Sequence, residues 1–96
     1  MKYSKSPRPY KRMVEILDDI LDELLRAEEK HPDWPADLIH AAAILGEESG
    51  ELPPAALDVV YSDGDIERIR QEAVQCGAMA VRLLLNLPAP PEAGHD

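Results

Sequence analysis

The chain has 96 residues, of which 45% are hydrophobic, and it carries a formal net charge of −9. This length predicts a single domain, and the apolar content excludes a wholly disordered chain. The acidic charge argues against binding to nucleic acid or to an anionic membrane surface, but it leaves room for a small anionic substrate that is accompanied by cations.

Residues 1–9 are polar and contain two prolines and several basic residues, so they are predicted to form a flexible N-terminal arm. They lack the apolar segment of a signal peptide, and no apolar run approaches the roughly 20 residues that span a bilayer. The only cysteine, Cys76, has no partner for an internal disulfide and is expected to be a buried thiol. These features together favour a cytoplasmic protein.

Apolar residues recur every three or four positions from Tyr10 to Lys30, which predicts an amphipathic helix with one buried stripe. The acidic residues between them, Glu23 among these, are expected to face solvent. Prolines at positions 32 and 35 end the pattern. The predicted buried stripe consists of Met13, Leu17, Ile20, Leu21, Leu24 and Ala27.

A second helix is predicted from Leu38, with Asp37 or Asp33 as its N-cap. Pro53 and Pro54 predict a stop or a kink, after which residues 55–61 could resume the helix. The sequence from Ser62 to Asp65 is typical of a turn, with Asp63 or Asp65 able to cap the next helix.

A third long helix is predicted over residues 66–87, and Pro88 ends it. Residues 88–96 contain three prolines, Pro88 included, and a glycine, and they are predicted to form a disordered C-terminal tail. The expected fold is therefore all-α: an antiparallel bundle of three to four helices over residues 10–87. Because so small a domain buries a limited core, we expect a homodimer or a dimer of dimers to complete it.

Two short clusters of oxygen-bearing side chains stand out within the helical pattern. Glu48 and Glu51 are three residues apart on one helix, as are Glu72 and Gln75 on the next. Carboxylates that converge in this way repel one another unless a cation lies between them, and Mg²⁺ prefers such oxygen ligands. The common alternative is a solvated helix face that has no site.

Two glycines, Gly46 and Gly50, flank the acids of the second helix. A glycine inside a helix costs roughly 1 kcal/mol relative to alanine. Their presence beside clustered acids predicts either the close approach of a neighbouring helix or access for a substrate.

The run from Ala42 to Leu52, which includes Glu48-Ser49-Gly50-Glu51, resembles the first motif of the MazG-like, all-α NTP pyrophosphohydrolase superfamily. That family carries Glu-x-x-Glu on one helix and Glu-x-x-Asp on the next. The run Glu72-Ala73-Val74-Gln75 is similar to the second motif except at its last position, and 20 residues separate Glu51 from Glu72. The resemblance covers roughly residues 37–87.

The resemblance implies Mg²⁺-dependent hydrolysis of a nucleoside triphosphate to the monophosphate and pyrophosphate, with a role in cleaning the nucleotide pool; Mn²⁺ could substitute. It implies that the metal ligands are Glu48, Glu51, Glu72 and Gln75. It also implies that Glu47 either binds metal or orients the attacking water, so that Glu47 and Glu48 are the candidate catalytic residues. Phosphoryl transfer depends mainly on positioning and on neutralising charge, which metal ions supply.

Three further residues are candidates for substrate binding: Trp34, His40 and Arg82. Trp34 could stack on a nucleobase or could anchor its loop to the bundle. His40 could contact the base or a phosphate, or could simply pack. Arg82, like Arg68 and Lys30, could contact phosphate or could be ordinary surface charge.

Two departures from the family pattern keep other functions open. Gln75 brings an amide where the family has a carboxylate, and Pro53-Pro54 interrupts a helix that the family continues. A non-catalytic member that serves as a binding or assembly module is therefore the main alternative. A plain helical module that docks a basic partner through its acidic face is the second.

Overall fold

The computed structural model describes residues 9–88 and confirms the all-α fold. Four helices follow one another: α1 (Tyr10–Lys30), α2 (Leu38–Gly50), α3 (Leu52–Tyr61) and α4 (Ile66–Asn86). No strand occurs in the described residues. The arm and tail predicted for residues 1–9 and 88–96 lie outside this range, apart from Pro9, which precedes the first turn of α1, and Pro88.

The helix ends follow the capping residues of the sequence. Asp37, and not Asp33, caps α2, because its carboxylate accepts the backbone N–H of Ile39 at 2.8 Å. Asp65 caps α4 in the same way by accepting from Glu67 at 2.9 Å. Such caps satisfy N–H groups that have no partner within the helix.

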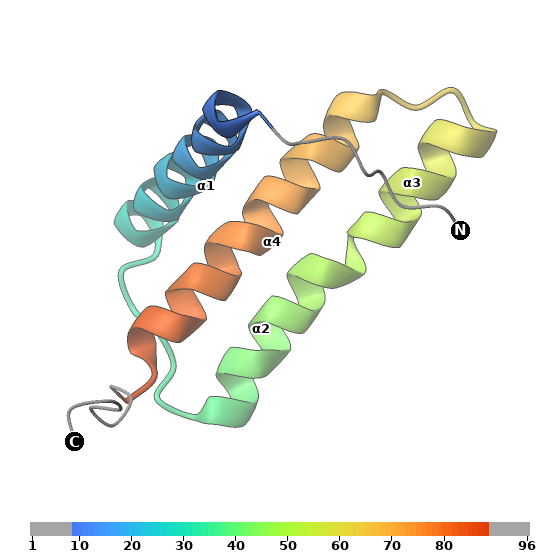
Figure 1. The fold of residues 1–96 in the computed structure, drawn as a ribbon. Coiled ribbons are helices and arrows are strands. Elements are labelled where there is room, and N and C mark those ends of the chain that lie inside the picture. Colours follow the sequence, from blue (N-terminus) through green and yellow to red (C-terminus); the bar gives the residue numbers. More distant parts are fainter. Residues whose placement is uncertain (1–8, 89–96) are drawn as a thin grey trace, which may run out of the picture.

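The double proline produces a bend and not a stop. Prolines at 53 and 54 offer no N–H to the carbonyls of Ser49 and Gly50, so α2 ends there. The N–H of Glu51 instead reaches back three residues to the carbonyl of Glu48 at 3.2 Å. Both prolines then lie in the first turn of α3, where a missing N–H costs nothing. Segments α2 and α3 are thus one helix bent at Glu51 (Figure 1).

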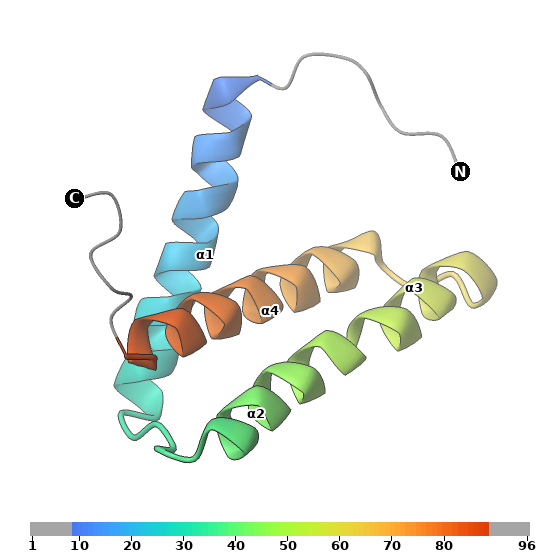
Figure 2. The same ribbon diagram turned by 60° about the horizontal axis from the view of Figure 1, so that its bottom comes forward.

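Helix α4 is the centre of the fold, since it packs against each of the other three (Figure 1). Within residues 9–88, α1 makes close backbone contact with α4 alone. Gly77 of α4 allows this approach, because a Cβ there would lie 3.1 Å from a methyl of Ile20. Figure 2 shows α1 crossing α4, with its N-terminal half pointing away from the other helices.

The core of the described chain is very small. Its buried apolar residues are Leu24, Ala41, Ala55 and Ala78. Leu24 is the one that is larger than alanine. The prediction of one buried stripe on α1 is wrong in this single chain, because Leu17 is 62% exposed and Leu21 is 51% exposed. Cys76 is half-buried, not buried as expected.

The two glycines beside the acids do not serve close helix packing. A Cβ placed on Gly46 or Gly50 would meet no atom within 4 Å, so both positions face open space. Of the two explanations offered by the sequence, the close approach of a neighbouring helix is excluded among residues 9–88.

Gly46 lies inside α2 and has room for a side chain, so Gly46→Ala is expected to raise the free energy of unfolding by about 0.5–1 kcal/mol. Urea denaturation followed by circular dichroism measures this change. Gly77→Ala is the control that should gain less, because its new methyl would press on Ile20. A loss of stability in Gly46→Ala would show that the open space is occupied in the assembled protein.

Candidate functional site

A cavity of about 370 Å³ lies between α1, α2, α4 and the loop that joins α1 to α2. Its volume is within the range typical of small-molecule sites. Twelve residues from these elements line it: Glu23, Arg26, Ala27, Lys30, His31, Asp33, Trp34, Ile44, Glu48, Gln75, Met79 and Arg82.

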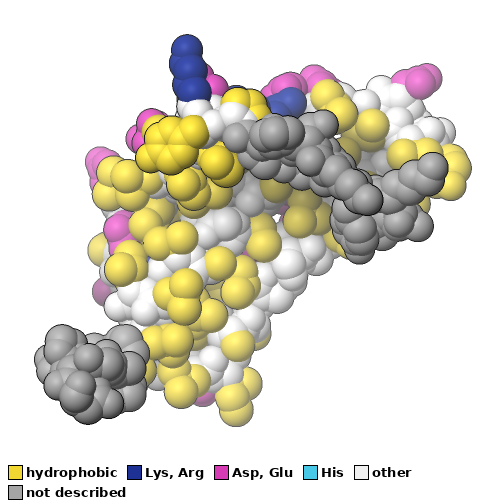
Figure 3. All heavy atoms as spheres, viewed as in Figure 1, with side chains coloured by type: hydrophobic (Ala, Val, Ile, Leu, Met, Phe, Trp, Pro, Cys, Tyr) yellow, Lys and Arg dark blue, Asp and Glu magenta, His cyan; other side chains and the backbone are white. Residues whose placement is uncertain are grey.

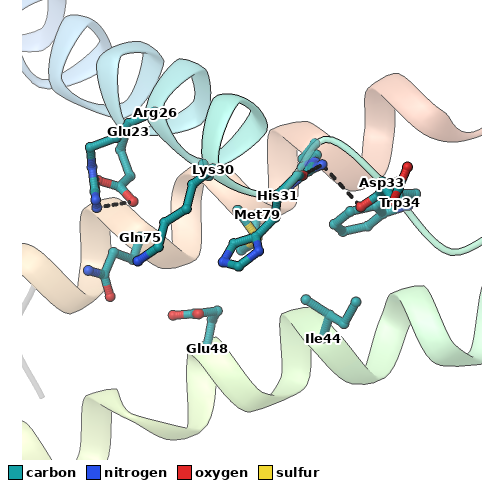
Figure 4. A pocket seen from close by; sticks show the side chains of 12 residues that line it. Glu23, Arg26, Lys30, His31, Asp33, Trp34, Ile44, Glu48, Gln75 and Met79 are labelled. Carbon is teal, nitrogen blue, oxygen red and sulfur yellow. Dashed lines mark hydrogen bonds and ion pairs between the residues drawn. The ribbon is translucent and has the colours of Figure 1, made fainter.

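The two ends of the cavity differ in chemistry (Figure 4). At one end Glu48 rises from α2 toward Gln75 of α4 and toward the charged side chains of α1. At the other end Ile44 faces the ring of Trp34. Met79 lies between the two ends. A ligand with a charged part and a flat apolar part fits such an arrangement.

Glu48 is the carboxylate at the centre of the acidic cluster. Partial burial raises its pKa above the ordinary value, and the negative charges of Glu72, Glu51, Glu23 and Glu47 raise it further. Glu48 forms no hydrogen bond or ion pair with another described side chain. The negative charges of these acids therefore act on Glu48, and no cation of residues 9–88 is paired to it.

The predicted metal ligands do not come together as closely as a metal site requires. Glu48 and Gln75 line the cavity, whereas Glu47 and Glu51 are exposed and Glu72 is half-buried outside the lining. Within residues 9–88, no three Asp, Glu, His or Cys side chains come close enough to hold one ion between them. In this side-chain arrangement the oxygen donors of the two motifs are neighbours but do not form a closed ligand set.

Glu23 is the residue that the sequence reasoning missed. Its side chain is 17% exposed, and it forms two short contacts with Arg26, at 2.7 and 2.8 Å, within the cavity. The signal was present, because Glu23 interrupts the apolar positions Ile16, Ile20 and Ala27 that share one side of the helix. An acid in that row faces α4 and not solvent.

Lys30 brings a second cation, after Arg26, to the acidic end. It lies in the last turn of α1 and points into the cavity, toward the space between Gln75 and Glu48 (Figure 4). It forms no ion pair within the described part of the chain. The lining thus holds both carboxylates and cations, in a protein whose overall charge is strongly negative.

Arg82 holds the loop between α1 and α2 against α4. It is 4% exposed, and its guanidinium donates hydrogen bonds to the backbone carbonyls of His31 and Asp33. The same group lies 5.0 Å from the ring centre of Trp34. Arg82 is therefore not ordinary surface charge, and its main contacts are structural, although part of it lines the cavity.

Trp34 and His40 differ in their relation to the cavity. Trp34 is half-buried and lines it, so it both anchors its loop through Arg82 and remains available to a ligand. His40 is exposed on the first turn of α2 and does not line the cavity. Contact between His40 and a substrate stays a prediction from the sequence.

No protein-family model matches this sequence, and neither a curated protein nor a solved structure matches it. No described helix combines the length and the apolar character needed to cross a membrane. The residues of the cavity and the two motifs are therefore the features that bear on function.

Replacing Arg82 removes the contacts that fix the loop. We expect Arg82→Ala to lower the free energy of unfolding by about 2–4 kcal/mol, because two partly buried carbonyl contacts lose their charged donor and Trp34 loses its stacked cation. Urea denaturation measures the difference. The matched control is Arg68→Ala, whose exposed pair with Asp58 should be worth about 1 kcal/mol or less. Equal effects of the two variants would contradict a structural role for Arg82.

Glu48→Gln is expected to raise the melting temperature at pH 7, in the absence of divalent ions, by about 1–4 °C. Because folding raises the pKa of Glu48, the folded chain holds this proton more tightly than the unfolded chain does. The resulting stability is complete below the unfolded pKa and is lost as the pH rises through the folded pKa.

The difference between wild type and Glu48→Gln should therefore shrink as the pH falls toward the ordinary pKa of a glutamate. Thermal melts at a series of pH values measure it. Glu67→Gln serves as the control that should not gain, since Glu67 is paired with Arg70 at the N-terminus of α4. A Glu48→Gln variant that is less stable at neutral pH would show that this carboxylate has a favourable partner.

Proposed function

We propose that this protein is a Mg²⁺-dependent nucleoside triphosphate pyrophosphohydrolase. The observation that carries the proposal is Glu48, a carboxylate that four other acids repel and to which no cation of the described residues is paired. It lies at the end of the cavity away from Ile44 and Trp34. The resemblance of its motif, and of the one around Glu72, to the MazG-like superfamily supports the same reaction.

The cavity suits a triphosphate bound together with a cation. Hard oxygen donors are the ligands that Mg²⁺ prefers, and the proposal assigns these to Glu48, Glu51, Glu72 and Gln75. A divalent cation would relieve the repulsion around Glu48, would neutralise phosphate charge and would lower the pKa of a bound water. Gln75 contributes an oxygen without charge, and Glu23, from the other side of the cavity, supplies further negative charge.

The remaining side chains of the cavity would bind different parts of the substrate. Lys30 and Arg26 reach the cavity from α1 and can contact phosphate oxygens as donors. Trp34, Ile44 and Met79 offer flat or apolar surface to the base. In the proposed reaction, water attacks the α-phosphorus and pyrophosphate leaves, and Glu47 or Glu48 accepts the proton from that water.

The expected biological role is the removal of unwanted nucleotides, including deoxy or non-standard ones, in the cytoplasm. We also propose that the functional form is a homodimer or a dimer of dimers. Its support is the core, which holds one leucine and three alanines as its buried apolar residues within the described chain. A domain of this size with so little buried surface needs a partner for stability.

One observation favours the second candidate, a non-catalytic binding or assembly module with the same fold. Among the described residues, the acids of the two motifs do not form a closed ligand set, and Gln75 removes one charge from it. A module of this kind would keep the cavity but would release no pyrophosphate.

Incubation with each common NTP and dNTP in the presence of Mg²⁺ tests the proposal. We expect release of pyrophosphate and monophosphate, abolished by EDTA and restored by Mg²⁺ or Mn²⁺. Glu48→Ala and Glu51→Ala should each lower the rate by about 100-fold or more, which is the scale for losing a group that stabilises developing charge. Glu67→Ala is the matched control and should retain the wild-type rate.

Thermal stability provides a readout that does not depend on finding the right substrate. Mg²⁺ should raise the melting temperature of the wild type, and this should cancel the advantage expected for Glu48→Gln. If no nucleotide yields pyrophosphate and Mg²⁺ leaves the melting temperature unchanged, the enzyme proposal fails and the module remains.

A further inference from the structure

The exposed apolar surface of α1 is arranged as a continuous stripe. Its residues follow one another at intervals of four, three, four and four, so they fall on one side of the helix. They are Tyr10, Val14, Leu17, Leu21 and Leu25. All five are exposed, and at 1.5 Å per residue the stripe runs for about 24 Å. Figure 3 shows hydrophobic side chains spread over α1 and α4 on one face of the molecule.

This stripe is separate from the side of α1 that packs on α4. Ile20, Leu24 and Ala27 face α4, with Leu24 buried and Ile20 against Gly77. At 100° per residue, the stripe is rotated by about a quarter of a turn from that side. The helix therefore offers two apolar sides, and the described chain covers only one of them.

A row of charges follows one edge of the stripe. Lys11, Asp18 and Asp22 are seven and four residues apart, so they lie in line along the helix, and all three are exposed. The row is basic at its N-terminal end and acidic beyond it. Lys11 forms no ion pair with another described residue.

We propose that the stripe on α1 pairs with the same stripe of a second copy of this chain, in an antiparallel arrangement about a two-fold axis near Leu17. Such an interface uses the same patch on both copies. In an antiparallel pair the charged row of each copy lies on the same side, which brings Lys11 of one copy opposite Asp22 of the partner subunit. Two Lys11–Asp22 pairs form only in this direction, one on either side of the axis near which the two copies of Asp18 lie.

A parallel pair fits the charges poorly. It would place the charged row of one copy along the other edge of the stripe, where Met13, Ile20 and Leu24 lead to α4. Asp18 and Asp22 would then lose water without gaining a cation, which is costly. The second copy in the antiparallel direction covers the leucines and pairs the charges together.

The proposal rests on the homodimer proposed above but not on the enzymatic activity. What is new is the surface through which the two copies pair and the direction of that pairing. The same helix, α1, would then serve both the dimer and the cavity, because its C-terminal half contributes Glu23, Arg26 and Lys30 to the cavity lining.

The first experiment measures the dimer dissociation constant of the full chain by sedimentation equilibrium. Leu17→Glu should raise this constant by about 100-fold or more, since the two-fold axis makes each substitution count twice. Ile39→Glu is the matched control, because Ile39 is 82% exposed on α2, outside the stripe, and should leave the constant unchanged. Far-ultraviolet circular dichroism checks that each variant is helical.

The second experiment exchanges the charges, which leaves the apolar contacts intact. Lys11→Glu should weaken the dimer by about 3- to 30-fold, because two symmetric ion pairs become repulsive. The double variant Lys11→Glu/Asp22→Lys should return the dissociation constant to near the wild-type value. Rescue by the second substitution is expected only of an antiparallel pair.

The possible failures are distinct. A wild-type chain that stays monomeric at about 100 µM, where even weak specific dimers form, overturns both the dimer and its surface. A dimer that survives Leu17→Glu but is broken by Ile39→Glu overturns the surface and leaves the dimer standing. A charge exchange without rescue overturns the antiparallel direction.

Discussion

The packing of α1 on α4 is the contact on which the rest of the structure depends. The other helices follow one another around α4, but α1 makes close backbone contact with α4 alone in the described chain. Gly77 permits the approach, and Arg82 ties the following loop to the far end of the same helix. One wall of the cavity, with Glu23, Arg26 and Lys30, is therefore positioned by α4 and not by the acidic helix that it faces.

Charge at the cavity follows from this arrangement. Helix α2 brings Glu48 and its acidic neighbours from one side, and α1 brings two cations and one more acid from the other. The carboxylate at the centre is left with unrelieved repulsion, which adds to partial burial in raising its pKa. Such a carboxylate binds a proton more readily than an isolated, solvated carboxylate does, and a bound cation would relieve its repulsion. The proposed metal and phosphate chemistry is an inference from that imbalance, supported by the resemblance of the motifs.

Most of the secondary structure could be predicted from local chemistry. The ends of α1, the cap at Asp37 and the bend before Pro53 all depend on residues within a few positions of one another. Burial could not be predicted in the same way. The apolar residues of α1 form two rows that periodicity alone merges into one, so the pattern assigns Leu17 to a core from which it is absent.

At the candidate site, too, local patterns predict some residues, whereas others depend on contacts between distant segments. Glu48 and Gln75 can be found from the sequence because each stands three residues from another oxygen-bearing side chain, and both line the cavity. Glu23 leaves a local sign, because it interrupts a row of apolar positions, but its place in the cavity depends on the angle at which α1 crosses α4. The sequence suggests Arg82 for the substrate, but its guanidinium holds a loop that starts 51 residues earlier in the chain. Contacts between distant segments determine both roles.

The bend at Glu51 has a consequence for the acidic motif itself. Glu48 belongs to α2, whereas Glu51 stands at the junction and precedes the first turn of α3. Ala55, one turn into α3, is completely enclosed, and its N–H donates to the carbonyl of Glu51 at 3.3 Å. Its methyl group has no room to grow, so a larger side chain would press on the junction at which Glu51 stands. Such a substitution would retune the acidic pair without touching either glutamate.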